Sequence, residues 1–251
     1  MHRKEAAVQA AAKIALVTGA ARRVGKAIAL ALAERGAHVA ITYRRSQAEA
    51  QQTLREIEAC GVGGLAVSGD ITRAADVHAI VQQVIERFGR IDILVNNASN
   101  YYKTPFATLS EDQWDDLVDT NLKGTFLMAK RVGDEMLQAE GGKIINLADW
   151  AGFRPYKDYL PYCVAKAGVI ALTKGLAKTL APTIQVNAVA PGPVMLPEDF
   201  TERERDAVIR ATPLKRIGSP ADIAQAVIFL VEGSDFITGT TLVVDGGRLI
   251  A

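Results

Sequence analysis

The chain has 251 residues, of which 49% are hydrophobic and 23% charged, the balance of an ordinary globular protein long enough to bury a large core. Its formal net charge of +1 gives no electrostatic reason to expect nucleic acid or an acidic membrane as a partner. Two cysteines far apart and three scattered histidines favour neither a disulfide framework nor a metal site.

The N-terminal stretch carries charge but no apolar signal core, so we expect residues 1–12 to form a flexible tail and the protein to be cytoplasmic. We expect no membrane-spanning segment, because no uninterrupted apolar run is long enough. Residues 13–251 show no linker-like shift in composition and no internal repeat. They are therefore predicted to form a single domain.

Short apolar runs predict strands, and longer amphipathic stretches between them predict helices. The strands are expected over 14–17, 37–42, 64–67, 91–95, 143–147, 184–189 and 240–244. The helices are expected over 27–35, 47–59, 74–88, 112–139, 162–180 and 220–231, and 198–210 reads as a polar, mobile segment. This alternation predicts an α/β fold with one doubly wound, Rossmann-type, mostly parallel sheet of about seven strands and helices on both faces.

A glycine-containing turn joins the first strand to the first helix. Gly19 would permit a tight turn and Gly25 a close approach of the helix to a ligand. Strand, turn and helix in this order aim free backbone N–H groups at a phosphate, although an ordinary βα turn has the same pattern.

The second strand ends in Tyr43-Arg44-Arg45-Ser46. In a dinucleotide-binding fold this position meets the adenosine ribose, where an acidic residue selects NAD and arginine accommodates the 2′-phosphate of NADP. The arginines favour NADP, while charged residues after a strand are also typical of a solvated loop. Gly19, Arg44, Asp70 and Asn97 all follow predicted strands, so we expect them at the same edge of the sheet.

Tyr162 and Lys166 are four residues apart in a helix-compatible run, so both side chains are expected on one helix face. A nearby ammonium would lower the tyrosine pKa and make it a usable acid at neutral pH. Asp149, just past an apolar strand, could meet the same site. A surface Tyr-Lys pair without a catalytic role is the alternative.

Six motifs resemble the short-chain dehydrogenase/reductase family in order and spacing: Thr18-Gly19, Asp70, Asn96-Asn97-Ala98 with Asn121, Tyr162 with Lys166, Pro191-Gly192, and Val244-Asp245-Gly246-Gly247. Two departures resemble its pteridine reductase branch. Arg23 stands where the family usually has a third glycine, and Asp149 stands where it usually has a catalytic serine. Tyr101 occupies a position that is aromatic in the same branch.

The resemblance implies that hydride passes from NADPH to a dihydropterin of the dihydrobiopterin, dihydromonapterin or dihydrofolate type. It implies catalytic roles for Asn121, Asp149, Tyr162 and Lys166, and substrate contacts from Arg23, Ser99, Tyr101, Asp149 and Tyr162. The residues expected to bind the cofactor are Gly19, Arg22, Arg23, Val24, Gly25, Tyr43, Arg44, Arg45, Ser46, Asp70, Ile71, Asn97, Ala98, Ser99, Tyr162, Lys166, Pro191, Gly192 and Val194.

Two other functions stay open on the sequence. One is a ketoreductase of 3-oxoacyl thioesters, sugars or alcohols, activities common in the wider family. The other is a silent NADPH-binding regulator, which the intact Tyr162 and Lys166 argue against. The resemblance also implies a homotetramer paired through the helices near 112–139 and 160–181, with the C-terminal tail and Arg248 bordering a neighbouring subunit's site.

Overall fold

The computed structural model describes residues 10–196 and 200–251, and its centre is one seven-stranded sheet in the order β3-β2-β1-β4-β5-β6-β7. The strands are β1 (Ile14–Val17), β2 (His38–Tyr43), β3 (Gly64–Ser68), β4 (Ile93–Asn96), β5 (Gly142–Leu147), β6 (Ile184–Pro191) and β7 (Thr241–Val244). Each neighbouring pair is parallel, so all seven carboxyl ends lie at one edge. The order reverses between β1 and β4, which is where doubly wound sheets bind their ligands.

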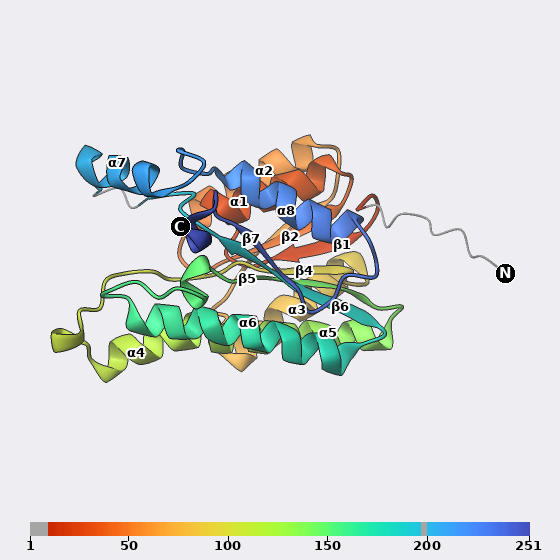
Figure 1. The fold of residues 1–251 in the computed structure, drawn as a ribbon. Coiled ribbons are helices and arrows are strands. Elements are labelled where there is room, and N and C mark those ends of the chain that lie inside the picture. The colour runs from red at the N-terminus through yellow and green to blue at the C-terminus, as the bar shows by residue number, and fades with distance from the viewer. Residues whose placement is uncertain (1–9, 197–199) are drawn as a thin grey trace.

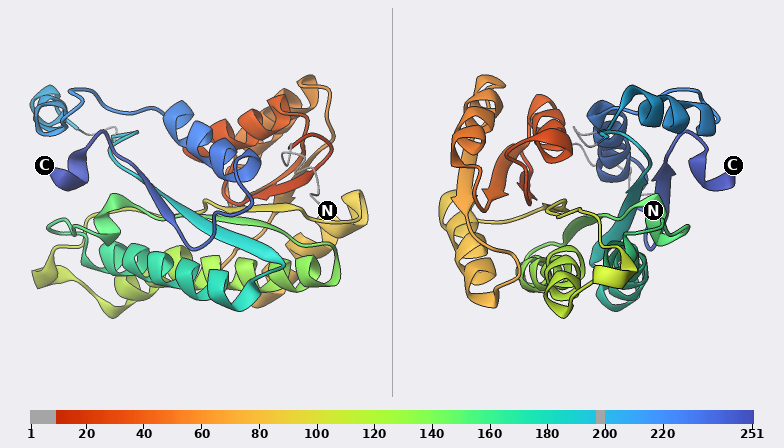
Figure 2. Two further views of the ribbon diagram at one scale, coloured as in Figure 1. Left: turned by 45° about the vertical axis from the view of Figure 1, so that its right-hand side comes forward. Right: turned by 90° about the vertical axis from the view of Figure 1, so that its left-hand side faces the viewer.

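Helices cover both faces of the sheet (Figure 1). On one face lie α1 (Arg23–Glu34), α2 (Gln47–Ala59) and α8 (Pro220–Glu232). On the other lie α3 (Ala74–Phe88), α5 (Gly124–Gln138) and α6 (Leu160–Leu180), with α4 (Glu111–Val118) leading into α5. A further helix, α7 (Glu202–Ala211), stands away from the sheet near the C-terminal end of the chain (Figure 2).

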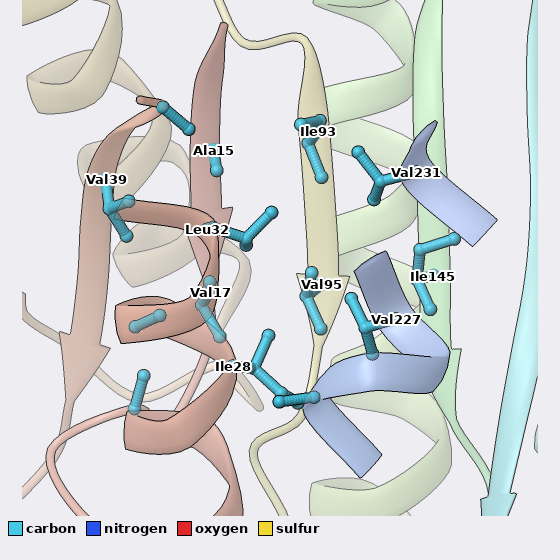
Figure 3. Close-up of a cluster of buried hydrophobic side chains, with 14 of the residues drawn as sticks. Ala15, Val17, Ile28, Leu32, Val39, Ile93, Val95, Ile145, Val227 and Val231 are labelled. Carbon is cyan, nitrogen blue, oxygen red and sulfur yellow. The ribbon is translucent and has the colours of Figure 1, made fainter. Parts of the chain in front are cut away.

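The core consists of two apolar layers, because successive side chains of a strand point to opposite faces. In β1, Ala15 and Val17 pack with Ile28 and Leu32 of α1 (Figure 3), whereas Leu16 packs into the layer on the opposite face. Strands buried on both sides explain the continuous apolar runs in the sequence.

The fold class predicted from the sequence is confirmed, and α2 and α3 have the predicted bounds. The helix predicted over 220–231 is present as α8, and Ser219 caps it, since its hydroxyl accepts from the backbone N–H of Asp222. The predicted helix over 112–139 is interrupted by a π-helical turn, η2 (Asp119–Lys123), which contains Asn121.

Two predictions about chain termini and loops need correction. Residues 1–9 of the expected tail lie outside the described residues, but Ala10 is fully buried and its N–H donates to Glu232. Residues 198–199 of the segment expected to be mobile also lie outside the described residues, and most of the rest forms α7, which begins with a reciprocal cap between Thr201 and Glu204. This cap satisfies backbone N–H donors at the first turn, so the segment forms a helix although many of its residues are charged.

One helix in the described part of the chain, α6, is long and apolar enough to cross a membrane by length and composition. Half of its most apolar window is buried inside the fold, where it packs beside β6 and η3 (Trp150–Gly152). This burial is typical of a core helix in a globular domain. The same helix carries Tyr162 and Lys166.

Candidate active site

The glycine turn after β1 is fixed to the end of β4 by reciprocal hydrogen bonds. The Thr18 hydroxyl accepts from the backbone N–H groups of Asn97 (2.9 Å) and Ala98 (3.0 Å). In return, the Asn97 side-chain amide donates to the carbonyl oxygens of Thr18 and Gly19 at 2.9 and 3.1 Å. Because the turn is held by other parts of the protein, its geometry is defined before any ligand binds.

Two glycines lie where the turn packs most closely against Asn97 and Ala98. Gly19 has φ +62°, and a Cβ at Gly25 would lie 2.4 Å from the Asn97 side-chain nitrogen. No side chain caps the N-terminus of α1, so its first N–H groups remain available for an anionic ligand. The turn therefore fits a dinucleotide pyrophosphate.

Arg23 adopts a left-handed backbone conformation, with φ +58°, at the position where the family usually has glycine. For a residue with a Cβ this conformation costs roughly 1–2 kcal/mol. Such strain persists where the surrounding structure imposes it, which is common at ligand sites. The side chain of Arg23 is exposed, beside Arg22.

The end of β2 forms a basic corner beside this turn. Thr42 accepts from the N–H of Gly19 (3.1 Å), which places Arg44 and Arg45 next to the turn. Arg44 donates to Asp70 at 3.2 Å. Burial alone would raise the pKa of Asp70, but hydrogen bonds from Thr72 and Arg44 outweigh it and lower the pKa. The corner keeps exposed cationic groups where a ribose phosphate would lie.

Asp149, Tyr162 and Lys166 come together beyond the end of β5. The Tyr162 hydroxyl donates to Asp149 Oδ2 at 2.8 Å. Lys166 Nζ donates to the carbonyl oxygen of Leu147 at 2.8 Å and lies 5.6 Å from the centre of the Tyr162 ring. The predicted meeting of these three residues is therefore present in the fold.

The predicted direction of the Tyr162 pKa is wrong. Burial and the neighbouring Asp149 raise the pKa of Tyr162 well above its ordinary value, so the hydroxyl keeps its proton at neutral pH. Burial lowers the pKa of Lys166 to about 8 and raises that of Asp149. The sequence argument counted only the nearby ammonium and left out the effects of burial and of the Asp149 carboxylate on the Tyr162 pKa.

Asn121 lies at the centre of a second network. Its amide donates to Asn100 Oδ1 (2.7 Å) and to the carbonyl oxygen of Leu117 (2.9 Å), while Ser99 donates to its Oδ1 (2.6 Å). Its own carbonyl oxygen accepts from the Thr125 hydroxyl. The π-helical turn at this position is a feature often found at functional sites. Ser99 and Asn121 are thus brought together, while Asn100 was missed from the sequence.

Tyr101 borders the same centre. Its ring stacks on Tyr159 with centroids 4.5 Å apart and meets Tyr162 edge-on at 4.9 Å. The side chain is 42% exposed, so it is neither a core residue nor a free loop residue. An aromatic side chain therefore stands directly beside the Tyr162 ring.

The loop after β6 packs against the end of β7. The N–H of Gly192 donates to the carbonyl oxygen of Val244 at 2.9 Å, and a Cβ there would lie 2.5 Å from Asp245 Cα. A pocket lined by Gly192, Pro193 and Val194 on one side and residues 243–247 on the other opens here. Pro191 ends β6 itself, and Ile71, in the turn after β3, packs against Gly124.

Two contacting residues, Tyr156 and Trp150, were not expected from the sequence. Tyr156 donates to Asp149, while Trp150 packs against Tyr156 and lies under the guanidinium of Arg248. The density of aromatic residues between Asp149 and Tyr162 was the available signal. Within this chain Arg248 also donates to the carbonyl oxygen of Ala211, and its expected role at a neighbouring subunit stays a prediction.

With this geometry in view, comparison with known proteins identifies the family. A family model described as enoyl-(acyl carrier protein) reductase matches residues 19–248. The chain belongs to the short-chain dehydrogenase/reductase family. Members named 3-oxoacyl-[acyl-carrier-protein] reductase share 40% identity over 94% of the chain in Staphylococcus epidermidis and 39% over 95% in Synechocystis, each alignment covering 98% of the relative.

Solved short-chain reductases have the same overall structure. A variant of actinorhodin polyketide ketoreductase with NADPH has a TM-score of 0.90 at 33% identity, with 98% of this chain and 100% of that chain covered. A Serratia marcescens short-chain dehydrogenase/reductase variant also has a TM-score of 0.90 at 33% identity, covering 96% and 99%. The protein is thus a nicotinamide-dependent oxidoreductase of the short-chain family.

Proposed function

We propose that the protein is an NADPH-dependent reductase of dihydropterins. The observation that carries this proposal is the carboxylate of Asp149, 2.8 Å from the Tyr162 hydroxyl. A ketone reductase must stabilise negative charge that develops on the substrate oxygen, and a carboxylate at that point would repel it. Reduction of a C=N bond instead needs a proton delivered to nitrogen, which an acid–hydroxyl pair can supply.

The proton assignment follows from the buried environment. Because burial raises the pKa of Asp149 and Tyr162 keeps its proton, Asp149 is the member of the pair that exchanges protons nearer neutral pH. Tyr162 orients the carboxyl group and completes the path toward the substrate. Among the described residues, Lys166 carries the one ammonium group that faces Asp149. This group is held in place by its hydrogen bond to the Leu147 carbonyl oxygen.

The residues around the glycine turn fit NADPH, since the turn leaves no space for a Cβ at Gly19 or Gly25 and borders a basic corner. When bound, this cofactor would supply the hydride. Gly19, Arg22, Val24 and Gly25 with Asn97 and Ala98 would hold the phosphates and nicotinamide half, and Tyr43 to Ser46 with Asp70 and Ile71 the adenosine half.

A flat pterin ring suits the surroundings of the acid pair. Tyr101 offers a partly exposed ring beside Tyr162 on which an aromatic heterocycle can stack. The Ser99 hydroxyl and the Arg23 guanidinium would supply polar contacts at its edge. The retained strain at Arg23 supports a role for its side chain, because glycine would relieve it.

The comparisons favour a second candidate, a 3-oxoacyl thioester ketoreductase. The relatives described above carry that name at about 40% identity over nearly the whole chain. In this function the Tyr162 hydroxyl would donate directly to the substrate oxygen. A silent NADPH-binding protein would need neither the Asp149–Tyr162 pair nor a buried Lys166.

The deciding experiment measures NADPH oxidation with a 7,8-dihydropterin and, in parallel, a short 3-oxoacyl thioester. We expect turnover of the pterin, lost by about 10²-fold or more in Asp149→Ser, because a positioned acid contributes about 10²–10⁴-fold. Asp134→Ser, which changes an exposed aspartate on α5, is the control and should leave both rates unchanged. Turnover of the thioester alone would establish the second candidate.

We also propose that the protein is a cytoplasmic homotetramer paired through α4, α5 and α6. Phe126 on α5 and Val164 on α6 are 43% and 41% exposed, as apolar residues at a subunit contact would be in an isolated chain. Light scattering on purified protein tests this assembly, and a monodisperse monomer would exclude it.

A further inference from the structure

The loop between η3 and α6 places a second tyrosine, Tyr156, beside Asp149. The Tyr156 hydroxyl donates to Asp149 Oδ1 at 2.6 Å, and the backbone N–H of Ala151 donates to the same oxygen at 2.7 Å. The other oxygen, Oδ2, accepts from Tyr162 at 2.8 Å. The two carboxyl oxygens therefore have different environments.

A carboxylate oxygen has about two lone-pair sites for hydrogen bonds. Both sites on Oδ1 are occupied, one by a backbone group that cannot move away without distorting η3. A proton taken up by Asp149 must consequently bind Oδ2, on the side of Tyr162. We infer that Tyr156 is a positioning residue that reserves the proton of Asp149 for the oxygen facing Tyr162. This inference rests on the proposed function only for its catalytic consequence.

Tyr156 is suited to be a permanent donor. Its ring packs against Trp150 (5.1 Å) and edge-on to Tyr159 (5.9 Å), and its backbone N–H donates to Cys163 Sγ at 3.4 Å. Burial and the neighbouring Asp149 raise the pKa of Tyr156, so its hydroxyl stays protonated wherever the enzyme works. Tyr156 thus holds Asp149 without competing as an acid.

The titratable groups that face Asp149 come from three segments. Tyr156 belongs to its own loop, Tyr162, Cys163 and Lys166 to α6, and Tyr101 to the loop after β4. Lys166 is the cation of this set and lowers the pKa of Asp149, whereas burial raises it. Removing only the Tyr156 hydroxyl leaves all the others in place, so the effect on Asp149 can be isolated.

The test compares Tyr156→Phe with Tyr102→Phe. Both tyrosines pack against the same apolar cluster, but the Tyr102 hydroxyl donates to Asp116 and not to Asp149. Protein labelled with ¹³C at aspartate carboxyl groups is titrated by NMR, and Asp149 is assigned by the loss of its signal in Asp149→Asn. We expect the Asp149 midpoint to rise by about one pH unit in Tyr156→Phe, because a donor to the charged form is lost.

The Tyr102→Phe midpoint should coincide with that of the unchanged protein. An unshifted midpoint in Tyr156→Phe, or an equal shift in both variants, would overturn the inference. In the dihydropterin assay the pH limb that belongs to Asp149 should move upward with the NMR midpoint, while the KM for NADPH stays the same. Absence of any pterin turnover would refute the proposed function, and the NMR titration would still decide the role of Tyr156.

A second measurement does not depend on the folding of Tyr156→Phe. In Asp149→Asn the side-chain oxygen should accept from Tyr156 and Ala151, which turns the NH₂ group toward Tyr162. Nuclear Overhauser contacts from this NH₂ group to the Tyr162 ring are the expected result. Contacts to the Tyr156 ring instead would show that Oδ1 is not reserved.

Discussion

Replacement of Arg23 separates backbone strain from side-chain chemistry. Its φ of +58° makes Arg23 strained by roughly 1–2 kcal/mol relative to glycine in the folded state. Glycine also adds roughly 0.5–1 kcal/mol of unfolded-state entropy, which opposes the gain. The matched control is Arg23→Ala, which loses the same guanidinium but keeps the Cβ and therefore the strain.

We expect Arg23→Gly to be more stable than Arg23→Ala by about 0.5–1 kcal/mol. For a domain of this size, 1 kcal/mol corresponds to a change in Tm of about 2–4 °C. Thermal melting of the two variants without NADPH measures this difference. Both variants should lose affinity for NADPH about equally, by roughly 10-fold or more, because each removes one charge-assisted contact.

A result in which Arg23→Ala melts at the same temperature as Arg23→Gly, or above it, would refute the reasoning. It would mean that the turn after β1, without bound NADPH, does not hold Arg23 in the left-handed conformation. Unequal NADPH affinities would show instead that the backbone at this position, and not the guanidinium alone, determines binding.

Three further predictions concern other parts of the site. Lys166 has its pKa lowered to about 8 by burial, so kcat should fall above that pH as the ammonium is lost, and Lys166→Arg should remove this limb of the pH profile. Between about pH 8 and about pH 10.4 the unfolded chain binds more protons at Lys166 than the folded chain does, so the free energy of unfolding contributed by Lys166 should rise with pH. Denaturant titrations at several pH values in this range measure the rise. Gly25→Ala should lower the free energy of unfolding by about 1–3 kcal/mol, because its Cβ would lie 2.4 Å from the Asn97 side chain. Gly175→Ala is the control on α6, where the added Cβ meets open space, and it should raise the free energy of unfolding by about 0.5–1 kcal/mol. Denaturant unfolding measures both. Arg44→Ala should raise the KM for NADPH about 10-fold and leave that for NADH unchanged, and an equal rise for both cofactors would remove Arg44 from 2′-phosphate recognition.

The sequence by itself determined the fold and the position of most candidate residues. Apolar runs such as Ile14–Val17 are typical of strands buried on both faces, and their alternation with helices allows few topologies. Once the strands are parallel, the residues that follow them share one edge. Asp70, Asn97 and Asp149 were therefore placed correctly without any distance being known.

Only the tertiary structure decided the electrostatics of the centre. The spacing of Tyr162 and Lys166 predicted a tyrosine acidified by an ammonium, but the fold buries the hydroxyl against Asp149 and reverses the direction of its pKa. Tyr156, seven residues from Asp149 along an irregular loop, has no periodicity that could place it. A pKa depends on burial and on distances in space, and neither of these follows from separation along the chain.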